Sequence, residues 1–524
     1  MIKNFKWLLL VSLTFVACSK NDEAGKVTEV PVTAGTADFS KYVSLGNSLT
    51  AGYSDGALFK KGQEGSYPSI LSQQFAKAGG GEFKIPFCGD DNLGGLLLGG
   101  YPIQPTRLYF NGVAPTNVAG MPKTEITAVL TGSFNNMGVP GAKSFHLLAA
   151  GYGNVAGVPS GAANPYFVRF AKSPNNTILA DALEQVPTFF SLWIGNNDVL
   201  SYATSGGIGV NQLGNLNPAT YGGNDITDPN VFANVYGNLI DNLVAKGAKG
   251  VVANIPDVTT VPFFTTIPVK PVAPSSYFVD GDESSSKPVI SAGDLATINQ
   301  LNSTLYGALH QILPDRFDVL SKTASNPLLI SDESLEDKGA LITYAAQNSG
   351  NPQLVALANY LGATFKKARQ SKMGDYVLLT TRGVIGTSAQ VPPGIPSALA
   401  KYGITYPLLD KHILVPTEVT EIKTATDAYN TTIKTLAESK GLAFVDANAL
   451  LNKVFKTGIR FGNFQITSTY VTGGAFSLDG VHPSPRGYAL IANEFLNAIN
   501  LTYGSTFRPV DLSLYPIQFP GVIN

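Results

Sequence analysis

A serine near the start of the chain and an aspartate–histidine pair near its end are the residues best suited to chemistry together. Ser48 follows the apolar run 42–45 and a glycine, a pattern typical of a strand end that presents a hydroxyl to a cleft. Asp479 and His482 are three positions apart, so one tight turn can place both side chains on the same side. A serine hydroxyl is a poor nucleophile unless a base takes its proton, and the base works best when an acid orients it. The chain therefore holds the groups needed for nucleophilic catalysis, in the order Ser, Asp, His.

Two segments between these residues could assist the same chemistry. Segments 135–142 (NNMGVPGA) and 190–198 (FSLWIGNND) are strand-like runs that end in glycines and amides. Such ends offer N–H donors to the negative oxygen that develops when a carbonyl is attacked.

The four segments resemble the sequence blocks of the SGNH (GDSL) hydrolases. In chain order the blocks are Gly46-Asn47-Ser48-Leu49, the segment around Gly138, Gly195-Asn196-Asn197-Asp198, and Asp479 to His482. One such block is a weak signal, whereas four in the right order, each beside a plausible strand, are a fairly strong one. Position 47 is asparagine where the family has aspartate, which keeps the size and hydrogen bonding but removes a charge.

The resemblance implies a role for each of these residues. Ser48 is the expected nucleophile, His482 the general base and Asp479 the residue that orients the imidazole. The oxyanion would be held by the Ser48 N–H, the Gly138 N–H and the side-chain amide of Asn197. Because the imidazole must be neutral to accept a proton, we expect activity to fall on the acidic side, around the ordinary histidine pKa of ~6.5. No cofactor is needed.

Each of these residues also has a simpler interpretation. Ser48 alone could be a turn serine, His482 a surface histidine and Asp479 a helix cap. Gly138 could be a plain turn glycine and Asn197 an asparagine that fixes a loop. Only the combination favours catalysis.

Strands that alternate with helices predict an α/β fold with a parallel sheet and helices on both faces. The resemblance refines this to a three-layer α/β/α, flavodoxin-like SGNH hydrolase fold with large insertions. Ligands of such sheets bind at the carboxyl ends of the strands, where three of the four blocks fall. Predicted strands end at 45, 194, 256 and 446, and predicted helices cover 66–77, 141–150, 230–246, 425–440 and 485–499.

We divide the chain into a signal peptide, a tether, one catalytic domain and a tail. The domain contains two insertions that do not fit a compact core, one rich in proline and serine and one that we interpret as a lid or side subdomain. The boundaries are 1–17 for the signal, 18–40 for the flexible tether, 41–505 for the domain, about 262–288 and 313–415 for the insertions, and 506–524 for the tail.

The amino terminus has the pattern of an export signal. A basic start precedes a short apolar run from 7 to 17, too short for a stable membrane span, and then Cys18. This resembles the lipoprotein signals of Bacteroidetes-type bacteria and implies lipidation of Cys18. Ser19 after the cysteine suggests the outer membrane, and Asp22-Glu23 suggests surface exposure. The alternative is an ordinary secretory signal with an incidental cysteine.

Composition excludes several other classes. With a net charge of −1 and no basic stripe with interleaved aromatics, nucleic acid is not an expected partner. Apart from Cys18 the only cysteine is Cys88, so no disulfide framework can form within one chain, and Cys88 is expected to be a small buried residue. We expect no metal at Asp479 and His482, because no third ligand is visible. The acidic segment 280–283 could hold calcium, but a solvated loop is our interpretation.

The sequence thus predicts a lipid-anchored serine esterase or lipase of the cell envelope that acts on a small-molecule, lipid or acylated-glycan ester. It leaves open the ester, and whether water or another acceptor receives the acyl group. The rival hypothesis is a non-catalytic surface lipoprotein that binds glycan or protein on a hydrolase scaffold.

Overall fold

The computed structural model describes residues 31–89, 92–272 and 292–523. The expected signal peptide, Cys18 and the acidic segment 280–283 lie outside these ranges. No helix in the described ranges is long and apolar enough to cross a membrane.

A five-stranded parallel sheet forms the centre of the molecule, which confirms the α/β class. Every neighbouring pair of strands is parallel, in the order β13-β8-β7-β1-β6. Numbered by their occurrence along the chain, these strands follow the order 2-1-3-4-5. They are short and largely buried, as expected when helices cover both faces of a sheet. Their bounds are Tyr42–Gly46 (β1), Asn136–Gly138 (β6), Phe189–Trp193 (β7), Lys249–Ala253 (β8) and Ala443–Val445 (β13).

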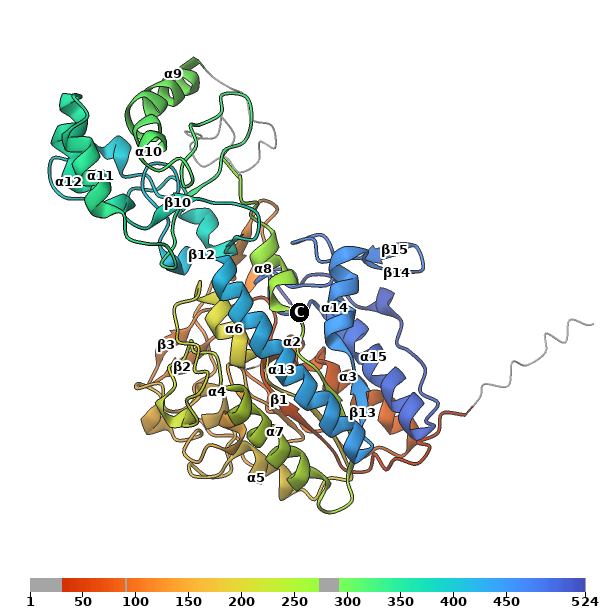
Figure 1. Ribbon diagram of the computed structural model, residues 1–524. Helices are drawn as coiled ribbons and strands as arrows, with labels where there is room; N and C mark the ends of the chain where they lie inside the picture. Colours follow the sequence, from red (N-terminus) through yellow and green to blue (C-terminus); the bar gives the residue numbers. More distant parts are fainter. Residues whose placement is uncertain (1–30, 90–91, 273–291, 524) are drawn as a thin grey trace, which may run out of the picture.

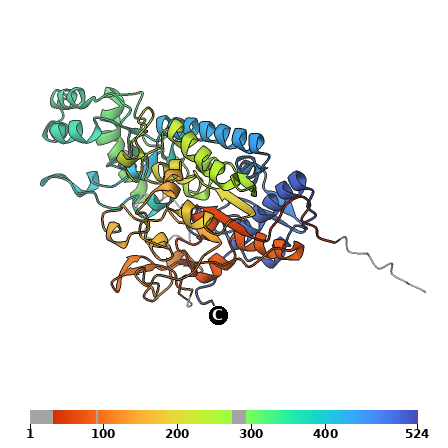
Figure 2. The ribbon, with the colours of Figure 1, turned by 90° about the horizontal axis from the view of Figure 1, so that it is seen from below.

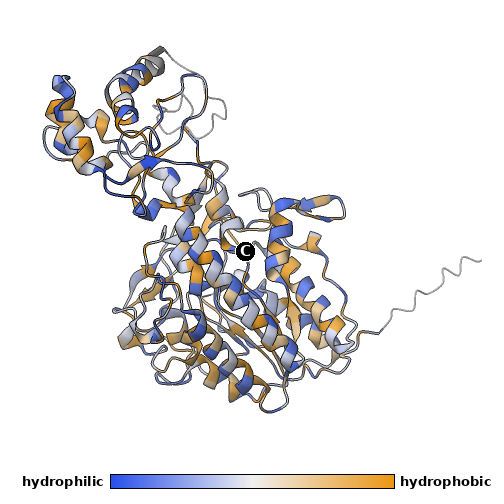
Figure 3. Cartoon of the chain, in the orientation of Figure 1, coloured by the Kyte–Doolittle hydropathy of each residue, from blue (hydrophilic) through white to orange (hydrophobic). Residues whose placement is uncertain are grey.

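Helices flank the sheet (Figures 1 and 2). Trp193 of β7 packs on Tyr67 and Phe495, which belong to α3 (Tyr67–Phe75) and α15 (Pro485–Tyr503). A second group contains α7 (Pro229–Val244) and α13 (Pro416–Lys440), which are joined by the stacked rings of Phe232 and Tyr429, 4.2 Å between centroids. Apolar residues are interspersed with polar ones along these helices, as expected for helices with one buried side (Figure 3).

Most of the predicted helices are present in the structure, but the prediction of a helix at 141–150 is wrong. That segment contains only the 3-10 turn η2 (Ser144–Leu148). Gly141 has a φ of +81°, outside the helical region, and the Ser144 N–H donates to the Asp198 carboxylate at 2.8 Å. Tertiary hydrogen bonds therefore replace the helical ones. The helix expected at 425–440 is α13, which already begins at Pro416.

Residues 267–272 and 292–415 form a second body with its own apolar core, which we call the side subdomain. Figure 1 shows it beside the sheet body, in green and cyan. The insertion expected at 313–415 belongs to it, but so do two helices that the sequence analysis left outside. The helices of this body are α9 (Ala292–Leu301), α10 (Gly307–Ile312), α11 (Gly339–Gln347) and α12 (Pro352–Phe365), and β9 (Leu329–Ser331) pairs with β10 (Ala368–Gln370).

The first described residues pack against the end of the domain, around residues 503–507, instead of extending as a tether. The Thr33 N–H donates to Thr506 Oγ1 at 2.8 Å, and the Thr36 N–H donates to the Tyr503 carbonyl at 2.8 Å. Phe39 lies in the core, 5.2 Å from the ring of Phe507. Residues 33–40 therefore belong to the domain, because aromatic side chains on both segments fill one core.

Candidate active site

The side chains of Ser48, His482 and Asp479 form a hydrogen-bonded chain. Ser48 Oγ lies 2.8 Å from His482 Nε2, and His482 Nδ1 lies 2.8 Å from Asp479 Oδ2. An ionised carboxylate can only accept, so Nδ1 carries the imidazole proton and donates it. In the neutral ring Nε2 is then free to accept the proton of the Ser48 hydroxyl. The structure thus brings together the three residues that the sequence analysis assigned to catalysis.

Ser48 is held where a strand turns directly into a helix. It is the first residue of α1 (Ser48–Ala51), two positions after the last residue of β1. Asn47 Oδ1 accepts from the Leu49 N–H at 3.0 Å, and Asn47 Nδ2 donates to Asn196 Oδ1 at 3.2 Å. The asparagine therefore links the ends of two adjacent strands through an N–H donor, which an ionised aspartate could not supply.

Asp479 accepts hydrogen bonds from several directions. Its Oδ1 receives the N–H groups of Val481 and His482 at 2.9 and 2.8 Å, and its Oδ2 receives that of Gly56 at 3.0 Å. The Ser477 hydroxyl donates at 3.0 Å. Burial raises the pKa of Asp479, but His482 and these N–H donors outweigh burial and lower the pKa to about 2. The carboxylate is therefore ionised at neutral pH and well below it.

Two contacts that the sequence analysis did not identify position the imidazole. The Tyr53 ring lies 4.6 Å from the His482 ring, centroid to centroid. Gly480, in the turn between Asp479 and His482, has a φ of +74°, and a side chain there would meet Phe263 and Leu379. The Phe263 N–H also donates to the Gly480 carbonyl at 2.9 Å. Segments from outside the turn therefore limit its movement.

Gly138 does not occupy the position expected of an oxyanion donor. It is the last residue of β6, and its N–H already donates to Asn136 Oδ1 at 3.0 Å. Gly141, three residues later, lines the cavity that also contains Ser48, Asn197 and His482. Its N–H has no acceptor within the described residues. Gly141, and not Gly138, therefore lines this cavity with Ser48, because the chain continues past β6 before it turns.

Asn197 and Asp198 begin α6 (Asn197–Thr204) at the end of β7. Asn197 Nδ2 donates to the Ala142 carbonyl at 2.9 Å, which uses one of its two amide hydrogens and holds the amide beside Gly141. Asp198 is buried and accepts from the Ser144 hydroxyl at 2.7 Å. Burial raises the pKa of Asp198. The side chain of Asp198 braces the loop that contains Ser144 and does not face Ser48.

Ser48 lies where two cavities of different character meet. One is a narrow cavity of about 100 Å³ lined mostly by apolar side chains, several of them from α14 (Ala447–Lys456) and α15. The other is wider, about 360 Å³, and is lined by Gln104, Asn164 and Tyr166 among others. Ser48 and His482 line both, so a reacting carbonyl at Ser48 could extend into each.

Cys88 and His146, a thiol and a second imidazole that could do chemistry, both have structural positions. Cys88 is buried, as expected, and burial raises the pKa of its thiol. His146 stacks on Tyr152, and burial lowers the pKa of His146 to about 4. Neither side chain lines the two cavities at Ser48.

The arrangement can remove a proton from a serine hydroxyl and offers unpaired N–H groups close to it, which are the requirements of nucleophilic acyl transfer. Comparison of the chain with protein-family models, with curated proteins and with solved structures found no match.

Proposed function

We propose that this protein is a serine ester hydrolase of the SGNH type. The observation that carries the proposal is the hydrogen-bonded chain from Ser48 Oγ through the imidazole of His482 to Asp479, with 2.8 Å at each step. A base held by an ionised acid and placed on a serine hydroxyl is the arrangement that activates serine for attack on a carbonyl.

In the first half-reaction His482 Nε2 removes the proton as Ser48 Oγ bonds to the ester carbonyl carbon. The oxyanion is held by the N–H groups of Ser48 and Gly141 and by the Asn197 amide. The carbon–oxygen bond to the alcohol then breaks, and His482 returns its proton to the leaving oxygen. In the second half-reaction His482 takes a proton from water as the water oxygen bonds to the acyl carbon. The bond from that carbon to Ser48 Oγ then breaks, His482 returns the proton to Oγ, and the acid leaves.

The topology of the sheet supports this proposal. The strand order 2-1-3-4-5 is that of flavodoxin-like sheets, the order that the resemblance to SGNH hydrolases implies. In such sheets ligands bind beyond the carboxyl ends of the strands, where the order reverses. Here that point lies between β1 and β7, whose ends carry Ser48 and Asn197.

The two cavities suggest how a substrate is oriented. We assign the narrow apolar cavity to the acyl chain, because Leu450, Leu451 and Ile491 offer no partner to a polar alcohol. The wider cavity, where Gln104 contributes a polar side chain, then takes the alcohol portion. The proposed substrate is therefore an ester of an apolar acyl chain with a more polar alcohol, which includes lipids and acylated glycans.

Envelope localisation through a lipid on Cys18 belongs to the same proposal and depends on the sequence pattern alone. Growth with a labelled fatty acid tests it. The wild-type protein should incorporate the label and sediment with membranes, and Cys18→Ala should do neither. Unchanged membrane association of Cys18→Ala would contradict the anchor without bearing on catalysis.

Labelling with a fluorophosphonate probe tests the enzyme proposal directly. Wild-type protein should react, Ser48→Ala should not, and Ser439→Ala, which changes an exposed serine at the end of α13, should react like wild type. A protein that neither reacts with the probe nor cleaves any member of an acyl-ester series would support the non-catalytic binding hypothesis instead.

A further inference from the structure

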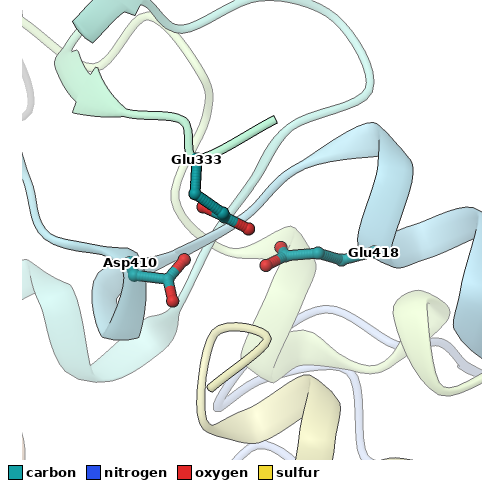
Figure 4. A group of neighbouring side chains, drawn as sticks. All are labelled: Glu333, Asp410 and Glu418. Carbon is teal, nitrogen blue, oxygen red and sulfur yellow. The ribbon is translucent and has the colours of Figure 1, made fainter. Parts of the chain in front are cut away.

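Three carboxylates converge where the side subdomain meets the sheet body. They belong to Glu333, two residues after β9, to Asp410, in the 3-10 turn η10 (Asp410–His412), and to Glu418, in the first turn of α13. One oxygen of each lies within 4.8 Å of the others. Figure 4 shows the three side chains pointing toward one another from separate segments.

Glu418 is the member whose burial is hardest to explain without a ligand. It is only 3% exposed. Its Oε2 accepts the Val415 N–H at 2.7 Å, but its Oε1 is buried and has no hydrogen-bond partner within the described residues. The Glu418 carboxylate points toward the other two (Figure 4). Asp410 Oδ1 is buried and unpartnered in the same way. Burial of two carboxylate oxygens without hydrogen-bond donors raises the free energy of the folded state, unless a positive group lies between them.

The described residues offer no side-chain cation to neutralise the cluster. Arg369 is a buried guanidinium of the same subdomain, but it is held by Asp332 and Asp375 at 2.6 and 2.7 Å. Within the described ranges no lysine or arginine forms an ion pair with Glu333, Asp410 or Glu418. Three carboxylates whose oxygens lie within 4.8 Å of one another repel when all are ionised. Only a proton or an external cation can relieve this repulsion.

The local backbone leaves room for the buried, unpaired oxygen of Glu418. Gly207, after the end of α6, has a φ of +82°, and a Cβ there would lie 1.8 Å from Glu418 Oε1. A Cβ on the neighbouring Gly206 would lie 2.4 Å from the backbone carbonyl oxygen of Asp410. The turn 206–207 thus packs closely against the cluster without supplying a hydrogen bond to either orphaned oxygen.

We propose that Glu333, Asp410 and Glu418 bind a calcium ion that fastens the side subdomain to the first turn of α13. A site with only carboxylate oxygens suits a hard cation, and calcium accepts six to eight oxygens at flexible geometry, with water completing the shell on the exposed side of Glu333. Zinc sites favour nitrogen and sulfur ligands, of which the cluster has none. The proposal is independent of the proposed ester hydrolysis.

Thermal unfolding of the full chain with and without calcium tests the site. Protein stripped with a chelator should gain at least ~3 °C in Tm when 1 mM calcium chloride is added, since an ion that binds only the folded state stabilises it. Isothermal titration should give about one calcium ion per chain. Magnesium at the same concentration should have a smaller effect, because it demands octahedral geometry and releases its water reluctantly.

Glu418→Gln separates a metal site from a merely acidic cluster. We expect it to abolish the calcium-dependent rise in Tm without lowering the Tm of the metal-free protein, because a neutral amide removes repulsion. Glu421→Gln, the same charge change one turn further along α13, should retain the full calcium effect. The proposal is overturned if calcium leaves the wild-type Tm unchanged, if Glu418→Gln responds like wild type, or if only acidification stabilises the protein.

Discussion

The hydroxyl oxygen of Ser48 lies 2.8 Å from Nε2 of His482, although 434 positions of the sequence separate the two residues. Ser48 follows the first strand of the sheet, and His482 lies just before the last helix. The contact requires the two ends of the sheet body to meet at one edge of the sheet, although the side subdomain lies between them in the sequence. This relationship gives the most direct prediction about activity.

Removal of either partner of this contact should abolish ester hydrolysis without unfolding the protein. We expect Ser48→Ala and His482→Ala each to lower kcat by ~10⁴-fold or more, because the two side chains act as one unit. The double variant should lose little more than either single variant. Steady-state kinetics and thermal unfolding measure both quantities, and fully additive losses would contradict a shared role.

Asp479 should contribute to activity and to stability. We expect Asp479→Asn to lower kcat by ~10⁴-fold, because the amide no longer fixes the imidazole in the tautomer that accepts from Ser48. The native pKa of about 2 lies below the ordinary value of 3.8, so the charge stabilises the fold above about pH 4, and that stabilisation is lost as the pH falls toward 2. The difference in Tm between wild type and variant should therefore be full at pH 6 and shrink toward pH 3. A difference in Tm that grows on acidification would contradict a lowered pKa of Asp479 in the folded protein.

The rate profile should show a single acid limb. Because Asp479 remains ionised above about pH 3, its own titration should not shape the profile between pH 5 and 8, and kcat/KM should fall on the acid side as the imidazole loses its ability to accept a proton. Measurements from pH 4 to 9 with a neutral ester check this. A flat rate from pH 5 to 8 would argue against an imidazole base.

Asn197 distinguishes transition-state stabilisation from loop packing. Asn197→Ala should lower kcat by ~100- to 1000-fold with little change in KM, because the amide is expected to bind the oxyanion more strongly than the ground-state carbonyl. Asn164→Ala is a matched control: it also removes an amide from the wall of the wider cavity, where Asn164 donates to the Pro140 carbonyl at 2.8 Å. It should affect stability more than kcat. Equal losses of kcat in both variants would indicate a structural role for Asn197.

The apolar cavity should set the preferred acyl length. Each methylene that becomes buried is worth ~0.8 kcal/mol, so kcat/KM should rise up to ~4-fold per added methylene until the cavity is full. Leu450→Trp narrows the cavity and should move the optimum to shorter chains, while Phe455→Trp, on the exposed side of the same helix, should not. If Leu450→Trp changes only the preference for the alcohol, our assignment of the two cavities is reversed.

The sequence by itself determined the pieces whose signals are local. The strand before Ser48, the helices around 230–246 and 485–499 and the three-residue spacing of Asp479 and His482 depend on short-range periodicity and turn geometry, and the structure contains all of them. The identity of the candidate triad was accessible for the same reason: each member lies next to a strong local pattern.

Only the tertiary structure decided how distant segments share space. It placed Gly141, and not Gly138, in the wall of the cavity that contains Ser48. The direction of each N–H depends on where the chain turns after β6, and the Gly138 N–H already has Asn136 Oδ1 as its acceptor. It replaced the helix expected at 141–150 with a turn held by Asp198, and it packed residues 33–40 against the end of the domain. It also brought together Glu333, Asp410 and Glu418, whose spacing matches no local motif. In each case the deciding free energy comes from contacts between residues far apart in the chain, which no window of sequence contains.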